Sequence, residues 1–176
     1  MCFAIQTCNP SIVTSREMFV EDVAEAIETV FFHRTEDAML FWNGVIIPIN
    51  YKYDLSVIID DIVVMLQNLL GKERGTCEVH FGSNSFLSIW NLKWQNNQLE
   101  ISAEWHSVAG DLNAVLTRCS NLEMPLDDFI AEWKVLLKLV IDALITSRCQ
   151  FAERDTFEAL VQTEALIQQN GCLYRN

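Results

Sequence analysis

The chain has 176 residues, 51% of them hydrophobic, and its 24 acidic and 12 basic residues give a formal charge of −12. A hydrophobicity this high excludes a disordered chain, and the acidic excess disfavours direct binding to nucleic acid or to anionic lipid. We expect a single cytoplasmic α+β domain over residues 1–176, with a mainly antiparallel sheet packed against amphipathic helices and no membrane-spanning segment.

The start of the chain predicts a strand and an acidic helix. Residues 2–7, CFAIQT, are typical of a short strand. After Ser15, apolar residues recur at helical steps, which predicts an amphipathic helix over about 16–32. Acidic residues gather in its first turns, where they suit the positive end of the helix dipole.

A β-hairpin is predicted over residues 38–49, because Asn43-Gly44 stands between two apolar runs and both residues readily adopt positive φ. Pro48 has no amide hydrogen, so its strand should lie at a sheet edge or carry a bulge. Two occupants of that edge stay open, namely the protein's own helices and a strand added by a partner.

A second amphipathic helix is predicted over 54–70, with Asp54 as its N-cap and Gly71 after its last turn. Its apolar face is wide. Asp60 and Asp61 are left for the outer surface, where they are candidates for partner binding.

Two further hairpins, over about 76–94 and 86–105, should form one antiparallel sheet. The first is predicted to turn through the four-residue loop 82–85. The second turns at Asn96-Asn97, which fixes its register and places three tryptophans on one face: Trp90, Trp94 and Trp105. Small residues stand opposite two of these indoles, as a packed layer requires, so the tryptophans are predicted to be core rather than a binding platform.

The opposite face of this sheet should be polar and carries six candidate partner-binding residues: Glu78, Leu87, Ile89, Lys93, Glu100 and Glu104. His80 and His106 share this face. The two histidines, like Glu78 and Glu104, are separated by an intervening strand and lie about 9–10 Å apart, too far for one metal ion or a shared proton. A metal site from Cys77 and His80 is also disfavoured, because residues three apart in a strand point to opposite faces. A solvated face and a protein-docking face both stay open.

The C-terminal half predicts a fourth strand over about 112–118, where a helical turn also fits, and then two helices. Pro125 should lie in the first turn of a helix over about 126–147, and a last helix over about 153–169 should end at Gly171. The six cysteines are scattered, which favours reduced thiols. Because no phosphate loop, nucleophile elbow or metal motif is present, we expect no enzyme, no cofactor and no metal.

The acidic domain, its sheet crossed by amphipathic helices and the run LEMPLDDFIAEWKVLLKLV resemble the bacterial immunity proteins of contact-dependent growth inhibition and related polymorphic toxin systems. The most similar piece is the helix 126–140 with Phe129 and Trp133, residues that core packing explains equally well. The resemblance implies a cytoplasmic, non-enzymatic inhibitor without a cofactor. Its partner would be a cognate toxin domain, basic and nuclease-like, covered by acidic residues.

On this hypothesis, acidic side chains of the sheet face and the first two helices steer the toxin, and buried contacts set the affinity. Two other classes of function stay open. An adaptor or scaffold subunit would have the same acidic sequence without motifs. A small-molecule-binding or hydrolytic domain would instead have an enclosed polar pocket.

Overall fold

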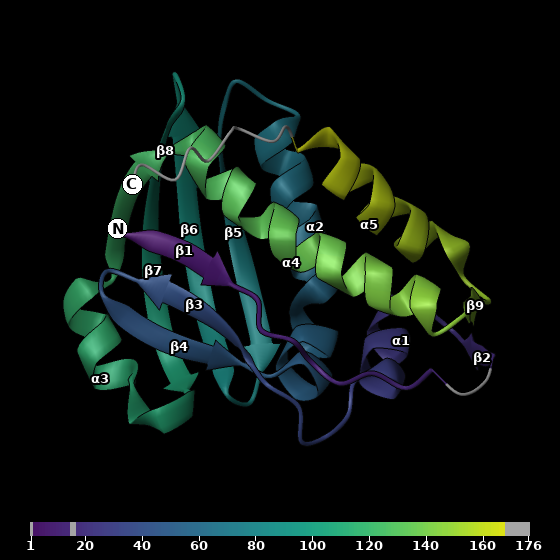
Figure 1. The fold of residues 1–176 in the computed structure, drawn as a ribbon. Coiled ribbons are helices and arrows are strands. Elements are labelled where there is room, and N and C mark those ends of the chain that lie inside the picture. The colour runs from purple at the N-terminus through teal and green to yellow at the C-terminus, as the bar shows by residue number, and fades with distance from the viewer. Residues whose placement is uncertain (1, 15–16, 168–176) are drawn as a thin grey trace, which may run out of the picture.

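The structure, a computed structural model, describes residues 2–14 and 17–167 and confirms a single α+β domain (Figure 1). Its largest sheet has four antiparallel strands in the order β5-β6-β7-β8. The strands are β5 (Arg74–Ser83), β6 (Phe86–Gln95), β7 (Gln98–Val108) and β8 (Asn121–Pro125). Side chains alternate between buried and exposed along them, so this sheet has one inner and one outer face.

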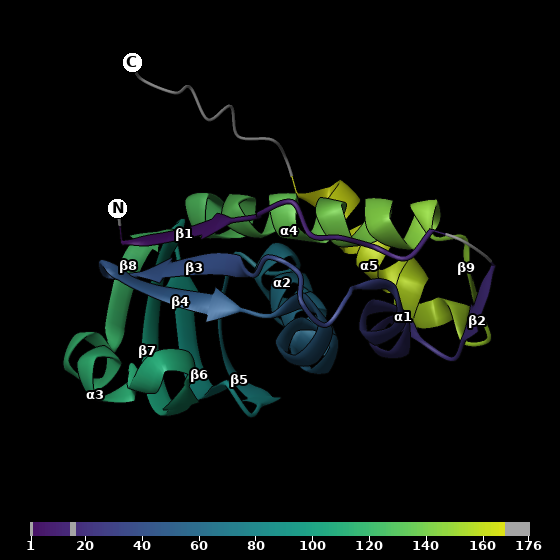
Figure 2. The ribbon, with the colours of Figure 1, turned by 60° about the horizontal axis from the view of Figure 1, so that its bottom comes forward.

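A second antiparallel sheet, in the order β1-β3-β4, lies over the inner face of the first (Figure 2). It consists of β1 (Phe3–Gln6), β3 (Ala38–Trp42) and β4 (Val45–Ile49). The hairpin turn at Asn43-Gly44 is confirmed, and β4 with Pro48 is an edge strand as predicted.

The main helices are α1 (Val23–Val30), α2 (Ser56–Leu70), α4 (Leu126–Thr146) and α5 (Arg154–Leu166), with a short α3 (Asn113–Leu116). In Figure 2, α2 lies beside β3 and β4 in the middle layer, and α4 runs with β1 on the side away from the four-stranded sheet. None of the described helices has the length and apolarity that crossing a membrane requires.

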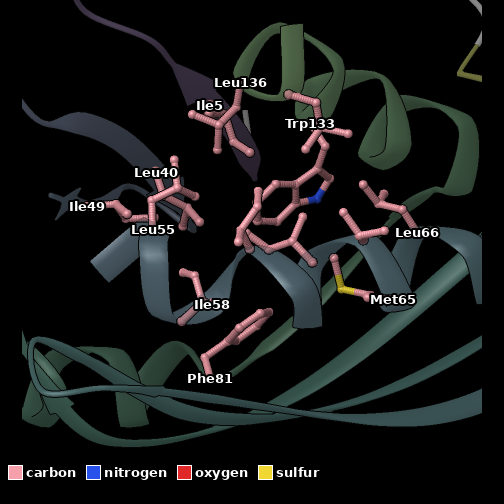
Figure 3. Close-up of a cluster of buried hydrophobic side chains, with 14 of the residues drawn as sticks. Ile5, Leu40, Ile49, Leu55, Ile58, Met65, Leu66, Phe81, Trp133 and Leu136 are labelled. Atoms are coloured by element: carbon pink, nitrogen blue, oxygen red, sulfur yellow. The ribbon is translucent and has the colours of Figure 1, made fainter. Parts of the chain in front are cut away.

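The core lies between the two sheets and around α2. Figure 3 shows Phe81 rising from the four-stranded sheet toward Ile58 of α2, while Trp133 descends from α4 toward the other side of that helix. The three tryptophans of the 86–105 hairpin are 0–7% exposed, with values of 0% for Trp90, 2% for Trp94 and 7% for Trp105. Trp90 and Trp105 pack into an aromatic cluster with Trp42, whose ring centre lies 4.9 Å from that of Trp90 and 5.2 Å from that of Trp105. The prediction that these indoles are core is confirmed.

The predicted helix over 16–32 is wrong in its first part. Met18–Val20 is instead a strand, β2, which pairs in parallel with β9 (Cys149–Phe151). The helix begins after Asp22, whose Oδ1 accepts a hydrogen bond of 2.9 Å from the Glu25 amide. The predicted start at Ser15 lies outside the described residues. Pairing with a strand about 130 residues further on overrides the local helical pattern here.

The predicted cap of the second helix is also wrong. A π-helical turn, Tyr51–Leu55, precedes α2, and the Asn50 side chain caps that turn. Asp54 is 2% exposed, and its carboxylate accepts hydrogen bonds from the Asn50 amide at 2.9 Å, from the Ser85 hydroxyl at 2.6 Å and from the Ser83 hydroxyl. Asp54 therefore fastens the start of α2 to the turn between β5 and β6.

The fourth strand does not lie at 112–118. Residues 109–119 form 3₁₀ and α-helical turns, the alternative that the sequence left open, and the strand follows at Asn121–Pro125. Pro125 ends β8 and directly precedes α4 rather than standing in its first turn. The helix α5 ends at Leu166. The predicted stop at Gly171 lies outside the described residues.

Candidate protein-docking surface

The outer face of the four-stranded sheet is polar and faces solvent. The structure places all six sheet residues predicted from the sequence on it. Glu78, Lys93, Glu100 and Glu104 are exposed, Leu87 is 39% exposed and Ile89 is half-buried. Because successive strand residues point to opposite faces, the buried tryptophans force the residues between them outward.

The pairing of β6 with β7 follows the predicted register, with Trp90 opposite Ala103 and Trp94 opposite Leu99. On the outer face this register sets Lys93 against Glu100, with 3.5 Å between Nζ and Oε2. Both side chains are well exposed, so this pair contributes little to stability.

The pairing of β5 with β6 differs from the prediction by two residues. Ser83 pairs with Phe86, so the loop is only Asn84-Ser85, and His80 lies opposite Ile89 instead of Leu87. A shift of two keeps every side chain on its predicted face, because the strand period is two. The same residues therefore face the core as predicted, and only the cross-strand neighbours of each residue change.

A β-bulge also alters the outer face near Leu87. Leu87 pairs with Ser107 while Ser88 pairs with Trp105, so His106 is an extra residue in β7. The four-residue loop predicted at 82–85 would have set His80, Leu87 and His106 in one row across the sheet, and this row does not form.

Glu123 belongs to this face and was missed, because the sequence prediction put the fourth strand at 112–118. It is exposed on β8 directly opposite Glu100. Like charges set opposite each other in a sheet are mildly destabilising, although Lys93 on the other side of Glu100 offsets part of this. With Arg74 included, the face has four carboxylates and two basic side chains, a net charge of −2 with neutral histidines.

Asp60 and Asp61 lie beyond the edge of this sheet, on α2, which packs beside both β5 and α1. Burial raises the pKa of both carboxyl groups above the ordinary aspartate value. The charge of Asp22 on α1 raises the pKa of Asp60 further. The charge of Asp60 raises the pKa of Asp61, while His80 on β5 opposes that increase.

Carboxylates thus run from α1 across α2 to β5. We call Asp22, Asp60, Asp61 and Glu78 the acidic band. Among the residues that the structure describes, no lysine or arginine forms an ion pair with any of the three aspartates. Asp22 was not among the predicted partner-binding residues, since the prediction placed it in the first turns of a helix and not at its N-cap.

Glu78 and His80 are hydrogen-bonded, with 2.7 Å between Oε1 and Nε2. Both side chains are more than half exposed, at 55% and 63%. This is an open surface pair without a cleft around it. Within residues 2–14 and 17–167, no three His, Cys, Asp or Glu side chains come together as a metal site would require.

The edge of β4 was the other candidate for partner binding. In a two-residue hairpin the residue pair next to the turn is hydrogen-bonded, and hydrogen-bonded and non-hydrogen-bonded pairs alternate along the strands from there. Ile46 and Pro48 belong to non-hydrogen-bonded pairs, so their backbone groups point to the free edge of β4. Ile46 offers an amide there, while Pro48 offers none. The edge is therefore a weak template for an added strand. At the opposite edge, the Ile5 amide of β1 already donates to Glu132 Oε2 of α4, at 2.9 Å.

A hollow of about 300 Å³ lies where the β6–β7 turn meets the start of α4, lined by Glu73, Asn96, Asn97, Leu126 and Asp127. The polar groups of Asn97 in this hollow accept hydrogen bonds from the first turn of α4. Asn97 accepts hydrogen bonds of 3.0 Å from two amides of α4, through its carbonyl from Leu126 and through its side chain from Asp127. The turn that fixes the hairpin register therefore also caps the longest helix.

No protein-family model, no curated protein and no solved structure matches this chain.

Proposed function

We propose that this chain is an immunity protein that binds and neutralises a basic, nuclease-like toxin domain through its acidic surface. The observation that supports the proposal most is one open surface, which runs from the outer face of the sheet over the edge of β5 to α2. It carries the six expected residues of the sheet face, and the two expected residues of α2, Asp60 and Asp61, adjoin it because α2 packs beside β5.

The surface suits steering of a basic partner. A net charge of −12 attracts a cationic protein from a distance, and complementary charge raises the association rate more than the final affinity. Ile89 lies between His80 and Glu104, and Leu87 lies beside it between Gly82 and Ser107, so two apolar side chains stand among polar neighbours, as interface anchors commonly do. The face lies on a sheet whose other side is packed core, so the backbone that carries its side chains is held in place before the partner arrives.

Co-expression tests the proposal. We expect the C-terminal domain of the protein encoded by the neighbouring gene to stop bacterial growth when it is expressed alone. Co-expression of this chain should restore growth, and a control variant with Asp142→Lys and Glu158→Lys, on α4 and α5, should restore it equally well. Growth arrest that this chain does not relieve would contradict the proposal.

A further inference from the structure

The exposed side of α2 combines apolar and acidic side chains in one row. Val57, Asp60, Asp61 and Val64, which we call the α2 stripe, follow helical spacing over two turns and therefore share a face. Val57 is 53% exposed and Val64 is 55% exposed, while the residues on the other sides of α2 are buried. Two aliphatic side chains thus flank two carboxylates.

The charge around the α2 stripe exceeds that of the sheet face. The neighbouring α1 and the residues just before it add four carboxylates, those of Glu21, Asp22, Glu25 and Glu28. Against these four and the two of α2 stands Lys52, whose ammonium group donates to the Glu28 carbonyl. Six acidic residues and one basic residue give −5, compared with −2 on the sheet face.

The ionised carboxylates of the α2 stripe also lie in an unfavourable environment. Burial and the neighbouring carboxylates raise the pKa of Asp60 and Asp61, which means that their charged forms are destabilised in the folded chain. On the sheet, by contrast, Lys93 offsets part of the repulsion between Glu100 and Glu123, and Glu78 is hydrogen-bonded to His80. A cationic partner would relieve the repulsion on α2 and would gain less on the sheet.

We propose that the α2 stripe is the centre of the partner interface and that it takes a basic amphipathic helix, with the sheet face at the periphery. Lysine or arginine side chains of that helix pair with Asp60 and Asp61, and its aliphatic side chains cover Val57 and Val64. Side chains of a helix pack well against the ridges of another helix, which favours this shape of partner over an extended strand. The inference rests on the proposed function and names the part of the surface that performs it.

Two charge-reversed variants of equal charge separate the two faces. One carries Asp60→Lys and Asp61→Lys, and the other Glu100→Lys and Glu104→Lys. Against the neighbouring-gene domain in surface plasmon resonance, we expect the α2 variant to raise Kd at least about 100-fold, as loss of desolvated charge pairs does, and the sheet variant less than about 5-fold. Val64→Ala should speed dissociation, while Val135→Ala, at an equally exposed valine of α4, should not.

A larger effect of the sheet variant, with binding and protection by the unaltered chain intact, would overturn this inference and leave the proposed function standing. Absence of binding by the unaltered chain would overturn both. A synthetic peptide of lysine and leucine, about 14 residues or roughly four helical turns long, provides a probe that needs no toxin. In NMR titrations its shifts should centre on residues 57–64, and shifts centred on 98–104 would overturn the inference.

Discussion

Replacing Lys134 with methionine should loosen α5 from α4. All three N–H donors of the Lys134 ammonium are used, at 2.9 Å to Glu164 Oε1, at 2.7 Å to the Glu164 carbonyl and at 2.7 Å to the Ile167 carbonyl. One lysine of α4 thus pairs with an acid of α5 and also satisfies two carbonyls at the end of that helix. Methionine keeps the aliphatic stem and removes every one of these bonds.

The size of the loss follows from burial. Breaking a fully buried ion pair costs about 3–5 kcal/mol, because the remaining charge is left without a partner. Here the side chains of Lys134 and Glu164 are 16% and 19% exposed, so water can reach the lone carboxylate in part. We therefore expect a loss of about 3 kcal/mol, which lowers the melting temperature of a domain this size by about 6–12 °C.

Urea and thermal unfolding monitored by circular dichroism measure this change. Lys138→Met is the matched control, because Lys138 lies one turn further along α4 in an exposed pair with Asp142 and should leave the unfolding midpoint unchanged. Adding Glu164→Met to the Lys134 variant should recover part of the loss by removing the unpaired carboxylate. A Lys134 variant as stable as the Lys138 control would refute this reasoning.

Three further predictions concern charge, capping and the sheet edge. Because the pKa of Asp61 is raised, the folded chain binds protons more readily than the unfolded chain, and stability falls as pH rises from about 3.9 through the folded pKa. Asp61→Asn should therefore stabilise the protein at neutral pH by about 0.5 kcal/mol, and urea midpoints should converge with those of the unaltered chain near pH 3. Asn97→Gly keeps the positive φ of the turn but loses the cap of α4, so it should cost about 1 kcal/mol in urea unfolding, whereas Asn96→Gly should cost nothing. Pro48→Val restores an edge amide on β4 and should raise self-association in sedimentation velocity; a variant as monomeric as the unaltered chain would show that the proline does not protect this edge.

The hairpins could be predicted because their turns are local. Asn43-Gly44 and Asn96-Asn97 all adopt positive φ, as such residues do readily, and each turn fixes the register of the strands beside it. The outer sheet face could be predicted for the same reason. Even the error of two residues between β5 and β6 left each side chain on its expected face.

The remaining errors come from contacts that no local pattern contains. The parallel pairing of Met18–Val20 with Cys149–Phe151 joins distant segments, and the partners of Asp54 are hydroxyls about thirty residues further on. The acidic band depends on which helix packs beside β5, a matter of tertiary structure. The exposed valines of the α2 stripe could have been predicted from the sequence, because their spacing of seven residues puts both on the side of the helix that carries Asp60 and Asp61.

Calorimetric titration of the purified chain with the purified C-terminal domain encoded by the neighbouring gene tests the central claim most directly. We expect a one-to-one complex with Kd in the nanomolar range, of the order seen in tight inhibitor complexes, that weakens as salt is raised. We also expect the toxin domain to lose its activity in this complex. Absence of binding heat at micromolar concentrations, or a complex in which the toxin domain stays fully active, would contradict the central claim.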